Sequence, residues 1–106
     1  MARGLYIAFT HPRDDNSEEE FNRWYTTHHL PEILAVDGVT SAARYKSADP
    51  NTTHRYMAAY TLEGDLPEIV ARIHADAGNR TMTTSSRADP GPQFRLFEFL
   101  EEQQAP

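Results

Sequence analysis

The chain has 106 residues, a formal net charge of −6 and no cysteine. This length is typical of one small domain, so we expect a single domain over 1–106, with an ordered core at about 3–100 and a tail at 101–106. The acidic balance and the lack of a Lys/Arg cluster argue against nucleic acid and anionic membranes as partners. No stretch has the pattern of a transmembrane helix or a signal peptide, and the cysteine-free composition fits the cytoplasm, where we expect the protein.

The first predicted element is a strand over residues 4–10. Leu5, Ile7 and Phe9 alternate there with residues that are themselves moderately apolar. Two apolar faces are typical of a strand that is covered on both sides. A polar turn at residues 11–16 follows.

A helix is predicted next, and it holds the densest group of functional candidates. Ser17 and Glu20 have the spacing of a capping box, which predicts the helix start. Four side chains follow at the spacing of one helical face, namely Phe21, Trp24, Tyr25 and His28. Pro31 cannot donate a backbone hydrogen bond, so we expect a kink or break there, then a short second turn that ends at Asp37-Gly38.

The second half of the chain repeats the alternation of strands and helix. Strands are predicted over 39–47 and 54–62, paired as a hairpin around a turn. Asp65 is expected to cap a second helix that Gly78 ends. The polar segment 79–92 is long for a loop, which is typical of lids.

A last apolar strand at 93–100 completes the order β-α-β-β-α-β. This order predicts an α+β, ferredoxin-like fold, in which a four-stranded antiparallel sheet carries both helices on one face. The other face of the sheet would then be apolar and uncovered. A second copy is the simplest cover, so we expect a homodimer packed sheet to sheet.

The segment 24–45 resembles the EthD-like branch of the dimeric α+β barrel superfamily. The resemblance is carried by Trp24, His28, Pro31 and the pair Asp37-Gly38, where proline is common in place of aspartate. It implies a homodimeric barrel with a small-molecule pocket between the first helix and the concave sheet. The wider superfamily includes cofactor-free monooxygenases, polyketide cyclases, lactone isomerases, dehalogenases and proteins of unknown role. The sequence has no Gly-rich phosphate loop and no Rossmann fingerprint, so we expect no nucleotide or flavin cofactor.

His28 is the candidate general base, because it continues the buried face and an imidazole titrates near neutrality. A core histidine that makes one hydrogen bond explains the position equally well, and the resemblance favours the functional interpretation. His29 lies about 100° further round an ideal helix and is expected to face the helix edge or solvent.

Six further residues complete the predicted site. Tyr56 and Tyr60 share one strand face and could donate hydrogen bonds to an oxyanion, although cross-strand packing is an alternative. The predicted substrate-binding residues are Trp24 and Tyr25, which would shape the pocket, Glu32, which could orient the His28 ring, and Arg44, which could anchor an anionic group.

Three functions remain open on these residues. The favoured hypothesis is a cofactor-independent enzyme that acts by His-assisted proton transfer on a small apolar or aromatic carbonyl compound, as a cyclase, isomerase, lyase or oxygenase. The alternative is a non-catalytic protein that binds or carries a small metabolite. A metal enzyme that uses His28 and Glu32 is a third possibility, but this pair alone is a weak metal signal, and no metal is expected.

Overall fold

The computed structural model describes residues 2–106 and contains four strands and three α-helices. In chain order they are β1 Ala2–Thr10, α1 Glu18–Trp24, α2 Leu30–Leu34, β2 Val39–Lys46, β3 Tyr56–Gly64, α3 Leu66–Ala75 and β4 Gln93–Glu98. A π-helical segment, η2 (Tyr25–His29), joins α1 to α2, and three short 3-10 turns lie in the connections. The predicted β-α-β-β-α-β order and the α+β class are confirmed.

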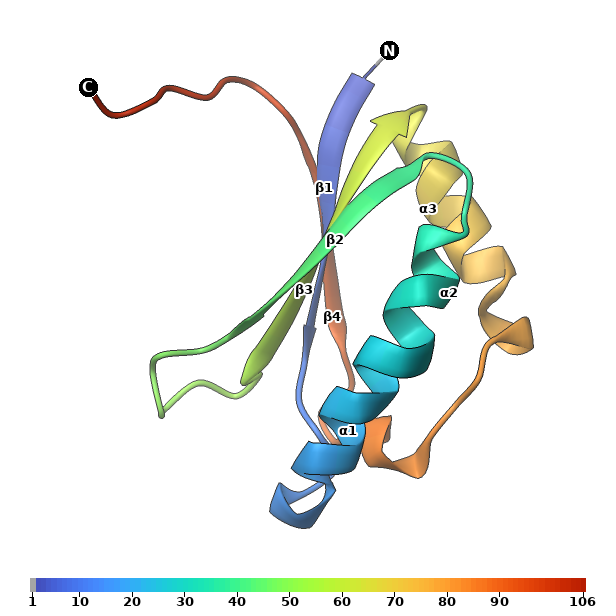
Figure 1. Cartoon of the computed structure of the whole chain (residues 1–106), viewed down its shortest axis with the longest axis vertical. Coiled ribbons are helices and arrows are strands. Elements are labelled where there is room, and N and C mark those ends of the chain that lie inside the picture. Colours follow the sequence, from blue (N-terminus) through green and yellow to red (C-terminus); the bar gives the residue numbers. More distant parts are fainter. Residues whose placement is uncertain (1) are drawn as a thin grey trace.

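The strands form one antiparallel sheet in the order β2-β3-β1-β4. The helices lie on one side of it, as the view along the edge of the sheet shows (Figure 1). Tyr6 of β1 is paired with Tyr60 of β3, so these two side chains point to the same face, toward the helices. The ferredoxin-like architecture predicted from the sequence is confirmed.

The hydrophobic core fills the space between the sheet and the helices. The helix-facing side chains of β1 and β3 alternate with more exposed ones, as the period of a strand requires. Phe21 of α1, Leu62 of β3 and Ile69 of α3 are almost fully buried and belong to one core cluster between the two layers. The first helical run, which comprises α1, η2 and α2, and α3 both lie over this side of the sheet.

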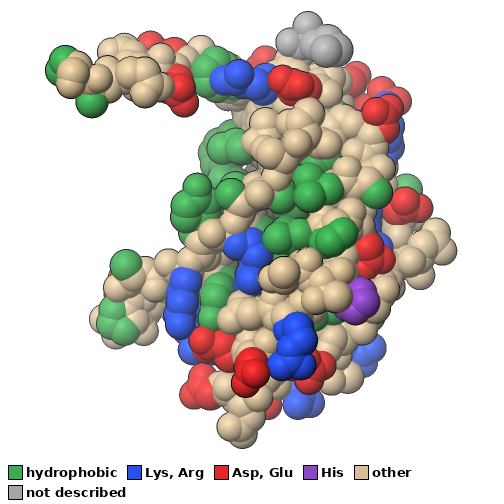
Figure 2. Space-filling view, in the orientation of Figure 1, with side chains coloured by type: hydrophobic (Ala, Val, Ile, Leu, Met, Phe, Trp, Pro, Cys, Tyr) green, Lys and Arg blue, Asp and Glu red, His purple; other side chains and the backbone are tan. Residues whose placement is uncertain are grey.

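The opposite side of the sheet is uncovered and apolar, and we call it the open face. From the strand registers its apolar members are Leu5, Ile7, Phe9, Ala43, Tyr45, Met57, Ala59 and Phe97. Tyr45 is 59% exposed and Phe97 is 53% exposed. Figure 2 shows hydrophobic side chains on the side of the sheet away from the helices. The prediction of a sheet apolar on both sides is therefore confirmed.

The two helix starts differ in how they are capped. Asp65 accepts a hydrogen bond from the Glu68 N–H at 3.1 Å, so the predicted cap of α3 is confirmed. Ser17 precedes α1, but its hydroxyl donates to the Asp14 carboxylate at 2.8 Å and caps no backbone N–H. The predicted capping box is wrong, because Ser17 ends a 3-10 turn with helical backbone angles and its side chain accepts from no backbone N–H of α1.

The break predicted at Pro31 is present in a different form. The helical run passes through η2, where the Leu30 N–H donates to the Tyr25 carbonyl five residues earlier. Pro31 then occupies the first turn of α2, where its missing N–H costs little. Within residues 2–106, no helix has the length and hydropathy needed to cross a bilayer.

Candidate functional site

A cavity of about 320 Å³ lies between the helices and the helix-facing side of the sheet. Its floor comes from β1 and β3, and its two side walls come from the first helical run and α3. The fourth wall is residues 79–92, which we call the wall segment; Figure 1 shows it in orange, passing from the end of α3 to beside α1. The wall segment contributes Arg80, Met82, Ser86, Arg87, Ala88, Pro90 and Pro92 to the lining.

Two side chains of the first helical run hold the wall segment in place. The Trp24 indole N–H donates to the Thr81 carbonyl at 2.8 Å, and the Glu32 carboxylate accepts from the Thr81 N–H at 2.9 and 3.2 Å. Trp24 also lines the cavity, as predicted, whereas Glu32 is absent from the lining. Glu32 therefore positions the wall of the cavity instead of contacting its contents.

The two histidines of η2 have exchanged their predicted places. His29 lines the cavity, where its ring stacks on Trp24 with centroids 4.5 Å apart and meets Tyr25 edge-on at 5.0 Å. His28 is exposed and lines a separate outer groove of about 250 Å³. The prediction that His28 points at the sheet is wrong, because each hydrogen bond in η2 spans one extra residue, and this places His29 where an α-helix would place His28.

The environment of His29 keeps its imidazole neutral. Burial and, to a lesser extent, the positive charge of Arg80 lower the pKa of His29 to about 4, while the nearby Glu32 carboxylate acts in the opposite direction. Its Nδ1 atom is buried and has no hydrogen-bond partner among residues 2–106. At neutral pH the cavity wall therefore contains a neutral imidazole whose Nδ1 atom has no partner among residues 2–106.

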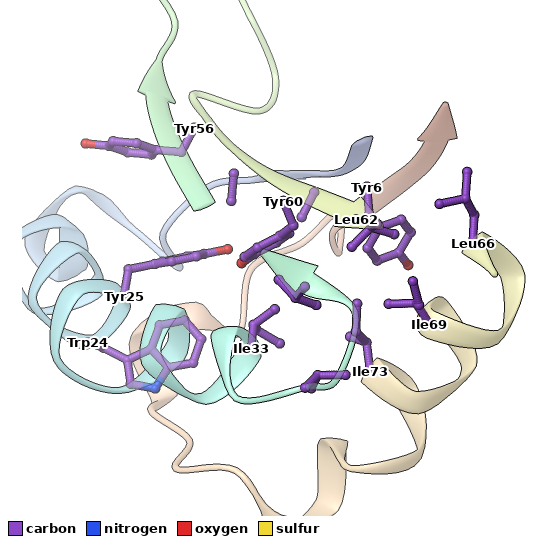
Figure 3. Close-up of a cluster of buried hydrophobic side chains, with 14 of the residues drawn as sticks. Tyr6, Trp24, Tyr25, Ile33, Tyr56, Tyr60, Leu62, Leu66, Ile69 and Ile73 are labelled. Carbon is purple, nitrogen blue, oxygen red and sulfur yellow. The ribbon is translucent and has the colours of Figure 1, made fainter. Parts of the chain in front are cut away.

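The three candidate tyrosines divide into two groups. Tyr25 and Tyr60 line the cavity, and their hydroxyl groups point toward one another (Figure 3). The Tyr60 hydroxyl is buried without a partner among the residues described, and burial raises the pKa of this phenol. Tyr56 lies outside the lining, since its hydroxyl donates to Glu18 at 2.8 Å and accepts from Asn22 at 3.2 Å. Tyr60 is thus the phenol available to a bound oxygen.

Arg44, the predicted anchor for an anionic group, is engaged elsewhere. Its guanidinium donates to the Asn22 side chain at 2.9 Å and lies 4.1 Å above the centre of the Tyr25 ring. The cavity wall instead contains Arg80 and Arg87, and the Nη2 atom of Arg80 is buried and has no partner within residues 2–106. Sequence reasoning missed Arg80, because it lies in a loop without periodicity.

A second polar pair lies on the α3 side of the cavity. Tyr6 and His74 both line it, and the Tyr6 hydroxyl is 2.6 Å from the His74 Nε2 atom. The Tyr6 ring also stacks on Phe94 with centroids 5.6 Å apart. Sequence analysis did not single out this pair, since 68 residues separate its members.

The unpartnered buried polar atoms gather around the cavity. Five of the six found in residues 2–106 belong to lining residues: Thr10 Oγ1, His11 Nδ1, His29 Nδ1, Tyr60 Oη and Arg80 Nη2. Buried polar groups in folded proteins nearly always have a partner, so such a cluster is typical of a site that binds a ligand. In the same part of the chain, no three His, Cys, Asp or Glu side chains are grouped in a way that could hold a metal ion.

No protein-family profile matches this sequence. Among curated proteins, the chain is similar to core atranone cluster (CAC) protein 1 of Stachybotrys chlorohalonatus, with 34% identity over 103 residues. The match covers 92% of this chain and 44% of that protein. The chain therefore spans less than half the length of the curated relative.

Three solved structures share the fold at low sequence identity. An ethyl tert-butyl ether d (EthD) family protein from Bacillus halodurans superposes with a TM-score of 0.63 at 13% identity, over 94% of this chain and all of that one. A candidate monooxygenase from Shewanella loihica gives 0.57 at 13% identity, over 98% and 99% of the two chains. A Dabb family protein with a ferredoxin-like fold from Mesorhizobium loti gives 0.51 at 12% identity, over 97% and 100%. The chain has the ferredoxin-like α+β fold that these three structures share, as predicted.

Proposed function

We propose that this protein is a small-molecule enzyme that binds an apolar or aromatic carbonyl compound in the cavity and removes a proton from it with His29. The observation that carries the proposal is that one cavity with largely apolar walls is lined by both His29 and Tyr60, whose Nδ1 and hydroxyl are buried without a partner among residues 2–106. A general base needs a free nitrogen within reach of the substrate, and this position supplies one.

The proposed step uses two side chains of the chain itself. His29 Nδ1 accepts a proton from the acidic carbon next to the substrate carbonyl, the C–H electron pair forms a C=C bond, and the π pair of the carbonyl moves onto its oxygen. The Tyr60 hydroxyl donates a hydrogen bond to the resulting enolate oxygen, and the surrounding apolar walls strengthen that bond by excluding water. No cofactor is required, because the substrate itself carries the charge. His28, the base predicted from the sequence, is replaced in this role by its neighbour.

Similarity to other proteins supports an enzyme over a carrier. One structural neighbour is described as a candidate monooxygenase, and another belongs to the EthD family. The curated relative is named for a core atranone cluster. Oxygenation, cyclisation and isomerisation of a carbonyl compound all begin with formation of a carbanion or enolate, so one proton-abstracting site is compatible with each of them.

The proposal also includes a homodimer in which two open faces pack together. Its support is the uncovered apolar side of the sheet, where Phe9, Tyr45 and Phe97 lie with no helix over them. Monomeric proteins rarely expose more than a few hundred Å² of continuous apolar surface. A two-fold dimer is the simplest closed arrangement that covers it.

The proton-abstraction step can be measured without knowing the natural substrate. The probe is 2-tetralone, an aromatic ketone with exchangeable C–H bonds, whose exchange with deuterated water is followed by NMR. The wild-type protein is expected to accelerate exchange, and His29→Gln to lose about 100-fold or more of that acceleration, the usual contribution of a general base. His28→Gln is the matched control and should retain it. Equal acceleration by wild type and His29→Gln would contradict the proposal.

A further inference from the structure

The charge of the cavity wall is opposite in sign to that of the whole chain. The lining residues include two arginines, Arg80 and Arg87, but no aspartate or glutamate. The chain as a whole has a net charge of −6. Such a distribution attracts an anion more strongly than a neutral ligand of the same shape.

Arg80 is the least satisfied of these charges. Other arginines of the described chain, such as Arg23, Arg55 and Arg72, form ion pairs with carboxylates within 3.3 Å. Arg80 has no ion pair within residues 2–106, and its buried Nη2 atom has no acceptor there. A buried guanidinium N–H without an acceptor is costly, and a bound anion would remove that cost.

Arg80 lines the same cavity as the proposed reacting groups, His29 and Tyr60. Its positive charge also contributes to the lowered pKa of His29. All three side chains present an unpartnered buried atom. The rest of the wall is mainly apolar and aromatic, including Phe21, Trp24, Ile33, Ile73, Met82 and Phe94.

We propose that the cavity selects substrates with an aromatic or alicyclic body and one anionic oxygen, which is bound by Arg80 and the Tyr60 hydroxyl. The anionic group is a carboxylate, phenolate or enolate, since each offers an oxygen that accepts from both donors. This inference rests on the proposed function, because it names the substrate class of the same cavity. It also transfers the anchoring role that the sequence suggested for Arg44 to Arg80.

An anion at this position would also prepare His29 for catalysis. In the free protein its pKa of about 4 makes it a weak base. A negative charge beside the ring would offset the field of Arg80 and raise the pKa toward neutrality, where a general base is most effective. The other charged groups that act on the ring are Glu32, which favours protonation, and Arg44, which opposes it. The base would therefore become stronger only when the cavity is occupied by the right class of molecule.

The test compares two probes of the same shape by isothermal titration calorimetry. 1-Naphthoate carries the carboxylate, and 1-naphthamide is its neutral counterpart. The wild-type protein is expected to bind the carboxylate about tenfold or more tightly than the amide, the gain of a charge-assisted hydrogen bond. Arg80→Gln should abolish the preference, and Arg80→Lys should restore part of it. Arg72→Gln removes a charge from the surface of α3 and should leave the preference intact.

Three outcomes would overturn the inference: equal binding of the two probes by the wild type, no binding of either, or an undiminished preference in Arg80→Gln. Circular dichroism of each variant shows whether it is folded, and Arg80→Lys provides a second measurement if the glutamine variant does not fold. A failure of the anion inference can be distinguished from a failure of the proposed function, because the proton-exchange assay uses a neutral ketone and not an anion. Exchange that depends on His29 without a preference for the carboxylate would contradict only the anion inference.

Discussion

At the scale of single residues, His29 couples protonation to folding. Its pKa is lowered to about 4 in the folded protein, against 6.5 for an unperturbed histidine. The unfolded chain therefore binds more protons between these two values. Stability is fully present above about pH 6.5 and is lost as the pH falls toward 4.

The expected size of this loss is about 3 kcal/mol for His29 alone, from the difference between the two pKa values. His29→Gln should remove that part of the pH dependence of the free energy of unfolding, measured by urea titration from pH 7 to pH 4. A smaller dependence should remain, because burial also lowers the pKa of His11. His28→Gln is the control, and an unchanged slope in His29→Gln would show that the ring is more solvated than its position indicates.

At the scale of elements, the wall segment depends on the contacts of Thr81. Replacing Glu32 with glutamine removes the charge from the acceptor of the Thr81 N–H. We expect hydrogen exchange at that amide to become about tenfold faster, since a hydrogen bond to a charged group is worth roughly 1.5–3 kcal/mol. Glu19→Gln, which affects only a surface pair with Arg23, should leave the exchange rate unchanged. The same rate in both variants would mean that Glu32 does not fix the wall.

The π-helical segment makes a second prediction at this scale. Deleting Thr27, which is exposed, should convert η2 to an α-helix while His29 keeps its place on the buried face. The thermal midpoint should stay close to the wild-type value. Deleting Arg23 is the control, because α1 has no extra residue to lose and Trp24 would rotate out of the core. Equal destabilisation by the two deletions would argue against this description of η2.

The elements were largely predictable from the sequence, and the site only in part. The strands follow from the alternation of apolar and polar residues, and the start of α3 follows from its capping residue. Both are local signals, as the side-chain cap at Asp65 illustrates. Trp24, Tyr25 and Tyr60 were correctly placed because helix and strand periods orient them. The exchange of His28 and His29 depends on one hydrogen-bond register, which no periodic pattern reveals. Arg80 lies in a loop without periodicity, and it lines the cavity because tertiary contacts determine how that loop folds over the cavity.

At the scale of the whole molecule, the proposed dimer depends on the open face. Stable dimers bury about 800 Å² or more per partner. The open face is apolar and no helix of the described residues covers it. The helices and the cavity lie on the other side, so a sheet-to-sheet dimer would leave the cavity wall formed by residues 79–92 unaltered.

Sedimentation at micromolar concentration should therefore give twice the chain mass. Phe97→Gln, on edge strand β4 of the open face, is expected to raise the dissociation constant about tenfold or more, because a large aromatic contact of the proposed interface is lost. Leu34→Gln is the matched control: Leu34 is also exposed, at 41%, but lies on the helical side. A wild-type protein that sediments as a monomer would contradict the dimer.

The extra residue in η2 has an evolutionary consequence. A π turn inside a helix corresponds to a single-residue insertion, so a relative with an uninterrupted helix is one residue shorter here. An ungapped alignment with such a relative would place His28 in the column of the cavity-facing residue, although His29 occupies that position in space. Ancestral reconstruction or transfer of catalytic residues across this group requires a gap within residues 25–29. Without it, the neighbouring histidine inherits a role that its side chain cannot reach.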